Sequence, residues 1–129
     1  MGKVLGIGGV FFKCHNKERL AQWYADNLQF DLNKYGGNEF KFDAVPENSF
    51  CMWGPFSEDT EYFAPSTKNF MINLIVDNVE LVLAKAKKGG ATTIGKIDEH
   101  EFGRFAWFLD PEGNKIELWQ PHKEQSPQL

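Results

Sequence analysis

The second half of the chain has the hydrophobic pattern of a strand, a helix and three further strands. The apolar run at 70–76, FMINLIV, predicts the first strand. Asp77 or Asn78 can cap a helix over 79–90, which ends at a pair of glycines. Short apolar runs separated by turn residues then predict strands at 91–97, 103–110 and 115–121.

The first half has the same order of patterns. A glycine-rich apolar stretch at 4–14 predicts a strand, and Asn16 can cap a helix that reaches residue 28. The helix has apolar side chains at helical spacing, at Leu20, Trp23, Tyr24 and Leu28. Turn residues then separate three strand candidates, at 30–35, 39–45 and 49–53.

These two halves form a repeat, which carries information about the fold. The end of the first half, FCMWGP at 50–55, aligns with IELWQP at 116–121. Glu117 corresponds to Cys51 in that alignment. We therefore predict a single domain over residues 1–129, with module 1 at about 4–55, a linker at 56–69 and module 2 at about 70–121.

Composition excludes several classes of partner. The chain has 129 residues and a formal net charge of −4, without a basic run of the kind that binds nucleic acid. Neither a membrane-spanning apolar run nor a signal peptide is evident, so we expect a cytoplasmic protein with no nucleic-acid or membrane partner. Cys14 and Cys51 form no CxxC pair and are expected to be free thiols, with Cys14 in the core.

Aromatic residues make up 15% of the chain, which is compatible with an aromatic pocket, a dimer interface or a phenylalanine-rich core.

The C-terminal segment FLDPEGNKIELWQP, at 108–121, resembles the signature of the vicinal oxygen chelate superfamily, also called the glyoxalase/bleomycin resistance/dioxygenase family. In that signature a tight turn precedes a strand that carries a glutamate. RLAQWYADNLQFDL, at 19–32, is similar to the first helix of the family, and NLIVDNVELVLAKAKKGGAT, at 73–92, to the matching strand and helix of the second half. The resemblance implies an α+β fold of two βαβββ modules, whose cupped mixed sheets enclose a pocket between them.

The resemblance also implies where a metal would bind. Metal-using members take one ligand from the first and last strand of each module. Those positions fall on Gly9, Cys51, Met71 and Glu117, and only Glu117 matches the family pattern. A catalytic divalent metal usually needs at least three strong protein ligands, so we expect no bound metal.

Strand alternation places Lys115, Glu117 and Trp119 on one sheet face, with Ile116 and Leu118 on the other. From alternation alone Glu117 is a solvated residue, whereas the resemblance implies that it points into the pocket. A buried carboxylate without a metal needs another partner. Its candidate partners are the cations Lys13, Arg104 and Lys115.

The resemblance, together with the same alternation, implies the other candidate pocket residues, with Cys51 placed by the resemblance alone. They are Phe11, Lys13, Cys51, Trp53, Met71, Asn73 and Trp119. Asn73 and Lys13 can bind polar groups, although Lys13 can equally be a surface lysine. The aromatic residues and Met71 suit a flat or apolar small molecule or, alternatively, a subunit interface. Cys51 is a poor nucleophile candidate because no histidine is placed to activate it.

Together these features predict binding of a small, partly apolar molecule in the pocket of a homodimeric, metal-free protein. Two alternatives stay open. One is a metal-dependent lyase, isomerase or dioxygenase of the glyoxalase I or dioxygenase type that uses Glu117. The other is a metal-free enzyme with Glu117 as its catalytic base.

Overall fold

The computed structural model describes residues 2–122. Its elements are α1 (Lys17–Leu28), the short 3-10 helix η1 (Phe42–Ala44), β1 (Ile72–Ile75), α2 (Val79–Lys88), β2 (Thr92–His100), β3 (Gly103–Leu109) and β4 (Lys115–Gln120). The four strands form one mixed sheet in the order β1-β4-β3-β2. β1 runs parallel to β4, and the other neighbours are antiparallel.

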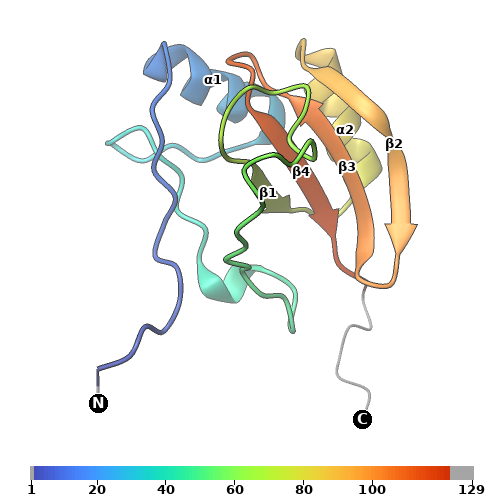
Figure 1. The fold of residues 1–129 in the computed structure, drawn as a ribbon. Helices are drawn as coiled ribbons and strands as arrows, with labels where there is room; N and C mark the ends of the chain where they lie inside the picture. The colour runs from blue at the N-terminus through green and yellow to red at the C-terminus, as the bar shows by residue number, and fades with distance from the viewer. Residues whose placement is uncertain (1, 123–129) are drawn as a thin grey trace.

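Both helices lie behind one face of this sheet, while the loop at 56–69, drawn in green, lies in front of the other face (Figure 1). The core is the layer between helices and sheet. It contains Leu20, Tyr24, Val79, Ala86, Ala91, Ala106, Phe108, Ile116 and Leu118. Half-buried Cys14 packs against this core, as its sequence position predicted.

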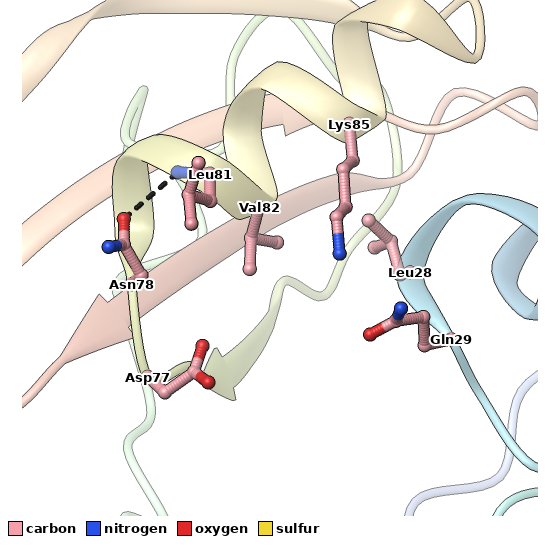
Figure 2. A pocket seen from close by; sticks show the side chains of 7 residues that line it. All are labelled: Leu28, Gln29, Asp77, Asn78, Leu81, Val82 and Lys85. Atoms are coloured by element: carbon pink, nitrogen blue, oxygen red, sulfur yellow. Dashed lines mark hydrogen bonds between the residues drawn. The ribbon is translucent and has the colours of Figure 1, made fainter.

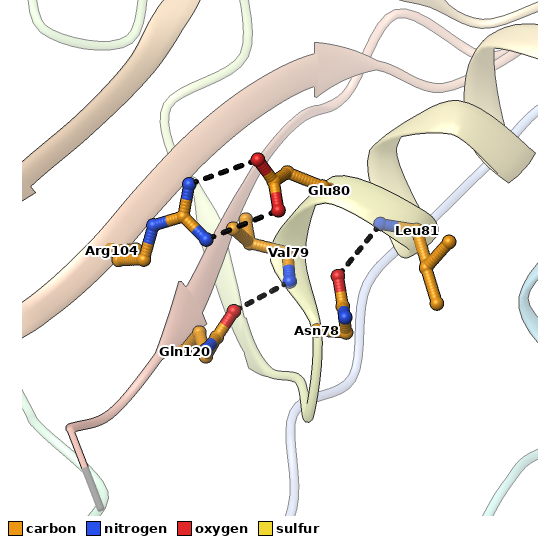
Figure 3. Close-up of polar contacts among 6 residues, drawn as sticks. All are labelled: Asn78, Val79, Glu80, Leu81, Arg104 and Gln120. Carbon is orange, nitrogen blue, oxygen red and sulfur yellow. Dashed lines mark hydrogen bonds and ion pairs between the residues drawn. The ribbon is translucent and has the colours of Figure 1, made fainter.

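Helix capping follows the sequence in both helices. The Asn16 side chain accepts a hydrogen bond from the backbone N–H of Arg19, and Asn78 accepts one from Leu81. A further contact fixes the start of α2 against the sheet, because the Gln120 side-chain oxygen accepts the backbone N–H of Val79 at 2.8 Å (Figure 3).

A bidentate ion pair on the same side joins α2 to β3. The two terminal nitrogens of Arg104 lie 3.3 and 3.2 Å from the two carboxylate oxygens of Glu80 (Figure 3). The Glu80 side chain is exposed, so its charge is largely screened and the pair adds little to stability. It does place Arg104 on the helix side of the sheet.

The second module has the predicted order of strand, helix and three strands, and the α+β fold class is confirmed. The strand bounds differ by a few residues from the sequence prediction. The largest change is in β2, which extends to His100, a residue predicted to lie in the following loop. The turn between the last two strands runs from Asp110 to Asn114, where the Gly113 N–H donates to the Asp110 carbonyl at 2.9 Å.

The first half differs more from the prediction. Residues 4–14 form no strand, and the same is true of 49–53. The segment 39–45 contains η1 in place of a strand, while 30–35 contributes one isolated bridge, Leu32 to Asn38. Strands are stable only in pairs, and the glycines at 6, 8 and 9 raise the entropic cost of ordering the first segment.

Candidate functional site

The turn before β4 is held by a buried carboxylate. Asp110 accepts four hydrogen bonds, at 2.8 to 3.0 Å, from the Tyr24 hydroxyl, the backbone N–H groups of Glu112 and Asn114, and the Asn114 amide. Burial and the neighbouring Asp110 raise the pKa of Tyr24, so its hydroxyl keeps its proton. These bonds connect α1 to the strand that carries Glu117.

A second carboxylate of the turn reaches the start of α1. Both oxygens of Glu112 accept backbone N–H groups, from His15 and Asn16, at 2.7 Å each. These two bonds hold the pKa of Glu112 below its usual value. Asp110 and Glu112 of the segment 108–121 therefore have structural roles. Glu117 is the remaining acidic residue of that segment and its candidate for binding or chemistry.

Glu117 lies on the sheet face opposite the helices, because its neighbours Ile116 and Leu118 belong to the core. Register pairs it with Asn73 on β1 and with Trp107 on β3. We call this surface the Glu117 face. Its members are Asn73, Phe105, Trp107, Lys115, Glu117 and Trp119.

Three neutral groups donate hydrogen bonds to the Glu117 carboxylate. The Asn73 amide bonds one oxygen at 2.7 Å. The Tyr62 hydroxyl and the Trp107 indole N–H bond the other oxygen, at 2.5 and 2.9 Å. Glu117 is only 8% exposed, so these donors replace the water that a buried carboxylate loses.

Aromatic rings surround this polar centre. The ring centres of Tyr62 and Trp107 lie 6.4 Å apart in a T-shaped arrangement. Those of Phe56 and Tyr62 lie 5.6 Å apart, with the rings stacked. Farther along β4, Trp119 lies 6.3 Å from Phe105 in a stacked arrangement. A carboxylate between apolar rings suits a small molecule that is mostly apolar and has one polar group.

Lys115 lies beside the carboxylate but bonds elsewhere. Its Nζ donates to the backbone carbonyls of Tyr62 and Ala64, at 2.6 and 3.0 Å. The same atom lies 5.1 Å from the Tyr62 ring centre, a cation–π distance. Burial lowers the pKa of Lys115, and the negative charge of Glu117 partly offsets this shift.

The predicted cationic partners of Glu117 need correction. Arg104 lies on the other sheet face, where it pairs with Glu80. Lys13 is exposed on the first-half segment. Lys115 is the one of the three that the structure places near Glu117, and it interacts through charge. The direct partners are neutral groups, and two of them, Tyr62 and Trp107, were absent from the sequence prediction.

The other predicted site residues fall into two groups. Asn73 and Trp119 lie on the Glu117 face, and half-buried Met71 directly precedes β1. Phe11 is 93% exposed and Trp53 76% exposed, and Cys51 is exposed as well. These three first-half residues face solvent in the described chain, whose strands form one sheet, so the pocket between two sheets stays a prediction.

The residues around Glu117 do not fit a metal site. Among residues 2–122, no three His, Cys, Asp or Glu side chains converge on one point. Both oxygens of Glu117 already accept N–H or O–H groups, which a cation would have to displace. We therefore derive no chemical step through a metal.

A groove of about 340 Å³ lies elsewhere, where the end of α1 meets α2 (Figure 2). It is lined by Leu28, Gln29, Asp77, Asn78, Leu81, Val82 and Lys85. All of these residues lie at or beside the two helices, so the groove is on the side of the sheet away from Glu117. None of the predicted site residues lines it.

Comparison with known proteins decides the family. In a comparison with models of protein families, the family described as glyoxalase-like domain matches residues 9–119 of this chain. The chain belongs to this family. It is thus a member of the vicinal oxygen chelate superfamily, as the turn and strand at 108–121 predicted.

The search of solved structures found two further similarities. The glyoxalase-like chain is similar to TnmS3, an antibiotic binding protein from Streptomyces sp. CB03234, with 20% identity and a TM-score of 0.59 over 95% of this chain and 100% of that one. A second match is a glyoxalase/bleomycin resistance protein/dioxygenase superfamily member from Sphaerobacter thermophilus DSM 20745. It has 19% identity, a TM-score of 0.47, and coverage of 81% of this chain and 88% of that one. No curated protein matches the chain.

At 20% identity the likeness to TnmS3 establishes the fold alone. No helix in residues 2–122 is both long and apolar enough to cross a bilayer.

Proposed function

We propose that this glyoxalase-like protein binds a small, partly apolar molecule on the Glu117 face, without a bound metal. The observation that carries the proposal is a buried carboxylate among aromatic rings, satisfied by three neutral donors. Such a centre can orient a ligand through one polar group while the rings contact its apolar part. The antibiotic-binding description of a structural neighbour is consistent with this proposal.

Tryptophan indole signals provide a direct test. We expect titration with 2-naphthol or naphthalene to shift the NMR signals of the Trp107 and Trp119 indole N–H groups, because both rings lie on the Glu117 face. Trp23 is an internal control, since its indole bonds the Gly89 carbonyl on the helix side. Shifts at Trp23 without shifts at Trp107 and Trp119 would move the binding site away from Glu117.

The metal-free part of the proposal has its own test. Elemental analysis of the purified protein is expected to find no stoichiometric Zn, Ni, Mn or Fe. One metal ion per chain would instead favour the alternative of a metal-dependent lyase, isomerase or dioxygenase that uses Glu117. If no metal is present, turnover that is lost in a Glu117→Gln variant while ligand binding is retained would favour the metal-free enzyme.

We also propose that the protein is a homodimer. Large apolar side chains of the first half are highly exposed, among them Val4 at 88%, Leu5 at 90% and Phe11 at 93%. β1 lies at the edge of the sheet and can pair with a further strand. Exposed apolar surface together with an edge strand favours association with a second copy.

Light scattering coupled to size-exclusion chromatography measures the oligomeric state. We expect about twice the chain mass of 14.8 kDa. A Phe11→Ser variant should shift the protein toward the monomer, whereas Leu81→Ser, which removes a 60% exposed apolar side chain on α2, should not. A wild-type protein that stays monomeric at high micromolar concentration would contradict the dimer.

A further inference from the structure

The Tyr62 side chain occupies the polar centre of the Glu117 face in the manner of a ligand. It comes from the segment at 56–66, which contains neither helix nor strand. Its hydroxyl forms the shortest of the three bonds to Glu117, at 2.5 Å. Its ring is T-shaped to Trp107, stacks on Phe56 and lies 5.1 Å from the Lys115 ammonium nitrogen. The surroundings are thus complementary to a phenol.

The backbone around Tyr62 has hydrogen bonds of its own. Lys115 bonds the carbonyls of Tyr62 and Ala64, and the Ser66 hydroxyl donates to the Gly113 carbonyl at 2.8 Å. The Tyr62 side chain can therefore leave Glu117 by rotating about its own bonds while the segment stays attached. Tyr62 is also 42% exposed, so moving its ring opens no hole in the core.

The Tyr62 group that donates a hydrogen bond to Glu117 is a neutral hydroxyl. Burial, together with the hydrogen bond to Glu117, raises the pKa of Tyr62, so the phenol stays protonated at neutral pH. An anionic oxygen here would face the Glu117 carboxylate and be repelled. A group that replaces Tyr62 must likewise donate a hydrogen bond and carry no negative charge.

We propose that the ligand of the Glu117 face is a planar aromatic molecule with a neutral hydroxyl, which displaces the Tyr62 phenol and donates its hydroxyl hydrogen to Glu117. This inference rests on the proposed function, since it names the ligand class for that same surface. Tyr62 is then an internal competitor, and ligands without a hydroxyl donor lose the bond to the carboxylate. Hydrogen bonds to charged groups are stronger than those between neutral groups, so the discrimination should be about tenfold or more.

Three matched probes test the ligand class on the wild-type protein. These are 2-naphthol, 2-methoxynaphthalene and naphthalene, which share a ring system and differ in the donor. We expect 2-naphthol to bind about tenfold more tightly than the other two. Equal affinities, with shifts at the Trp107 and Trp119 indoles, would overturn this inference and leave the proposed function standing. No shift with any probe would count against both.

Two variants test the roles of the residues. Tyr62→Ala removes the competitor and should bind 2-naphthol about tenfold more tightly than the wild type. Tyr35→Ala, which removes another exposed tyrosine, should leave the affinity unchanged. In Glu117→Gln the preference for 2-naphthol over 2-methoxynaphthalene should shrink. Weaker 2-naphthol binding by folded Tyr62→Ala would overturn the inference even if Glu117→Gln does not fold.

Discussion

Replacement of Asp110 by alanine is expected to lower the free energy of unfolding by about 3–5 kcal/mol. Asp110 is 5% exposed and accepts four hydrogen bonds. The substitution leaves the Tyr24 hydroxyl, two backbone N–H groups and an amide without their acceptor in a buried place. Unmade hydrogen bonds of this kind cost about 1–3 kcal/mol each, and partial entry of water reduces the sum.

Urea unfolding measures the effect, with Asp98→Ala as the matched control. Asp98 is an exposed aspartate on β2, and its replacement should change stability by at most about 0.5 kcal/mol. If Asp110→Ala and Asp98→Ala unfold at the same urea concentration, the hydrogen bonds of Asp110 do not hold α1 to the sheet.

Gly103→Ala is expected to destabilise the protein by about 3 kcal/mol or more. Gly103 has a φ of +132°, and a Cβ atom there would lie 2.3 Å from the Gln120 carbonyl oxygen and 3.0 Å from the Trp119 indole nitrogen. That oxygen is backbone of the neighbouring strand, so the sheet itself must shift. The end of the Glu117 face that carries Trp119 should shift with it.

The control is Gly90→Ala. Gly90 also has a positive φ, +103°, but an added Cβ atom would meet no other atom within 4 Å. It therefore isolates the backbone strain, about 1–2 kcal/mol, from the steric clash. Thermal unfolding should rank the wild type above Gly90→Ala, and Gly90→Ala above Gly103→Ala. A reversed order of the two variants would show that the close approach at Gly103 is relieved without cost.

The second module was predictable because most of its strands pair with strands that are close along the chain. Its antiparallel strands β3 and β4 are joined by a short turn, and alternation along β4 places Ile116 and Leu118 in the core. The same alternation puts Arg104 with Ala106 and Phe108 on the helix side. Applied to that strand, it would have removed Arg104 from the candidate partners of Glu117.

The first half was not predictable in the same way. A strand needs a partner, and the runs at 4–14, 39–45 and 49–53 have strand-like composition without a strand pairing in the described chain. The pattern of these runs indicates apolar side chains that need a packing partner, but it does not indicate which segment or chain that partner is. The proposed second copy of the chain is one answer to that question, which light scattering can test.

The candidate site was predictable only in part. Alternation and the family resemblance placed Glu117 and Asn73 on one surface, and the structure joins them at 2.7 Å. Tyr62 gave no signal, because it lies in an irregular segment 55 residues before Glu117 along the chain. Side chains that loops bring to a sheet follow no period in the sequence. Trp107, in contrast, follows from the register of β3 against β4.

A crystal structure of the protein with 2-naphthol bound tests the central claim most directly. We predict the naphthalene ring on the Glu117 face beside Trp107, with the naphthol oxygen at hydrogen-bond distance from Glu117 and the Tyr62 ring displaced. Binding in the groove between α1 and α2 instead, with the Tyr62 hydroxyl still on Glu117, would contradict the account.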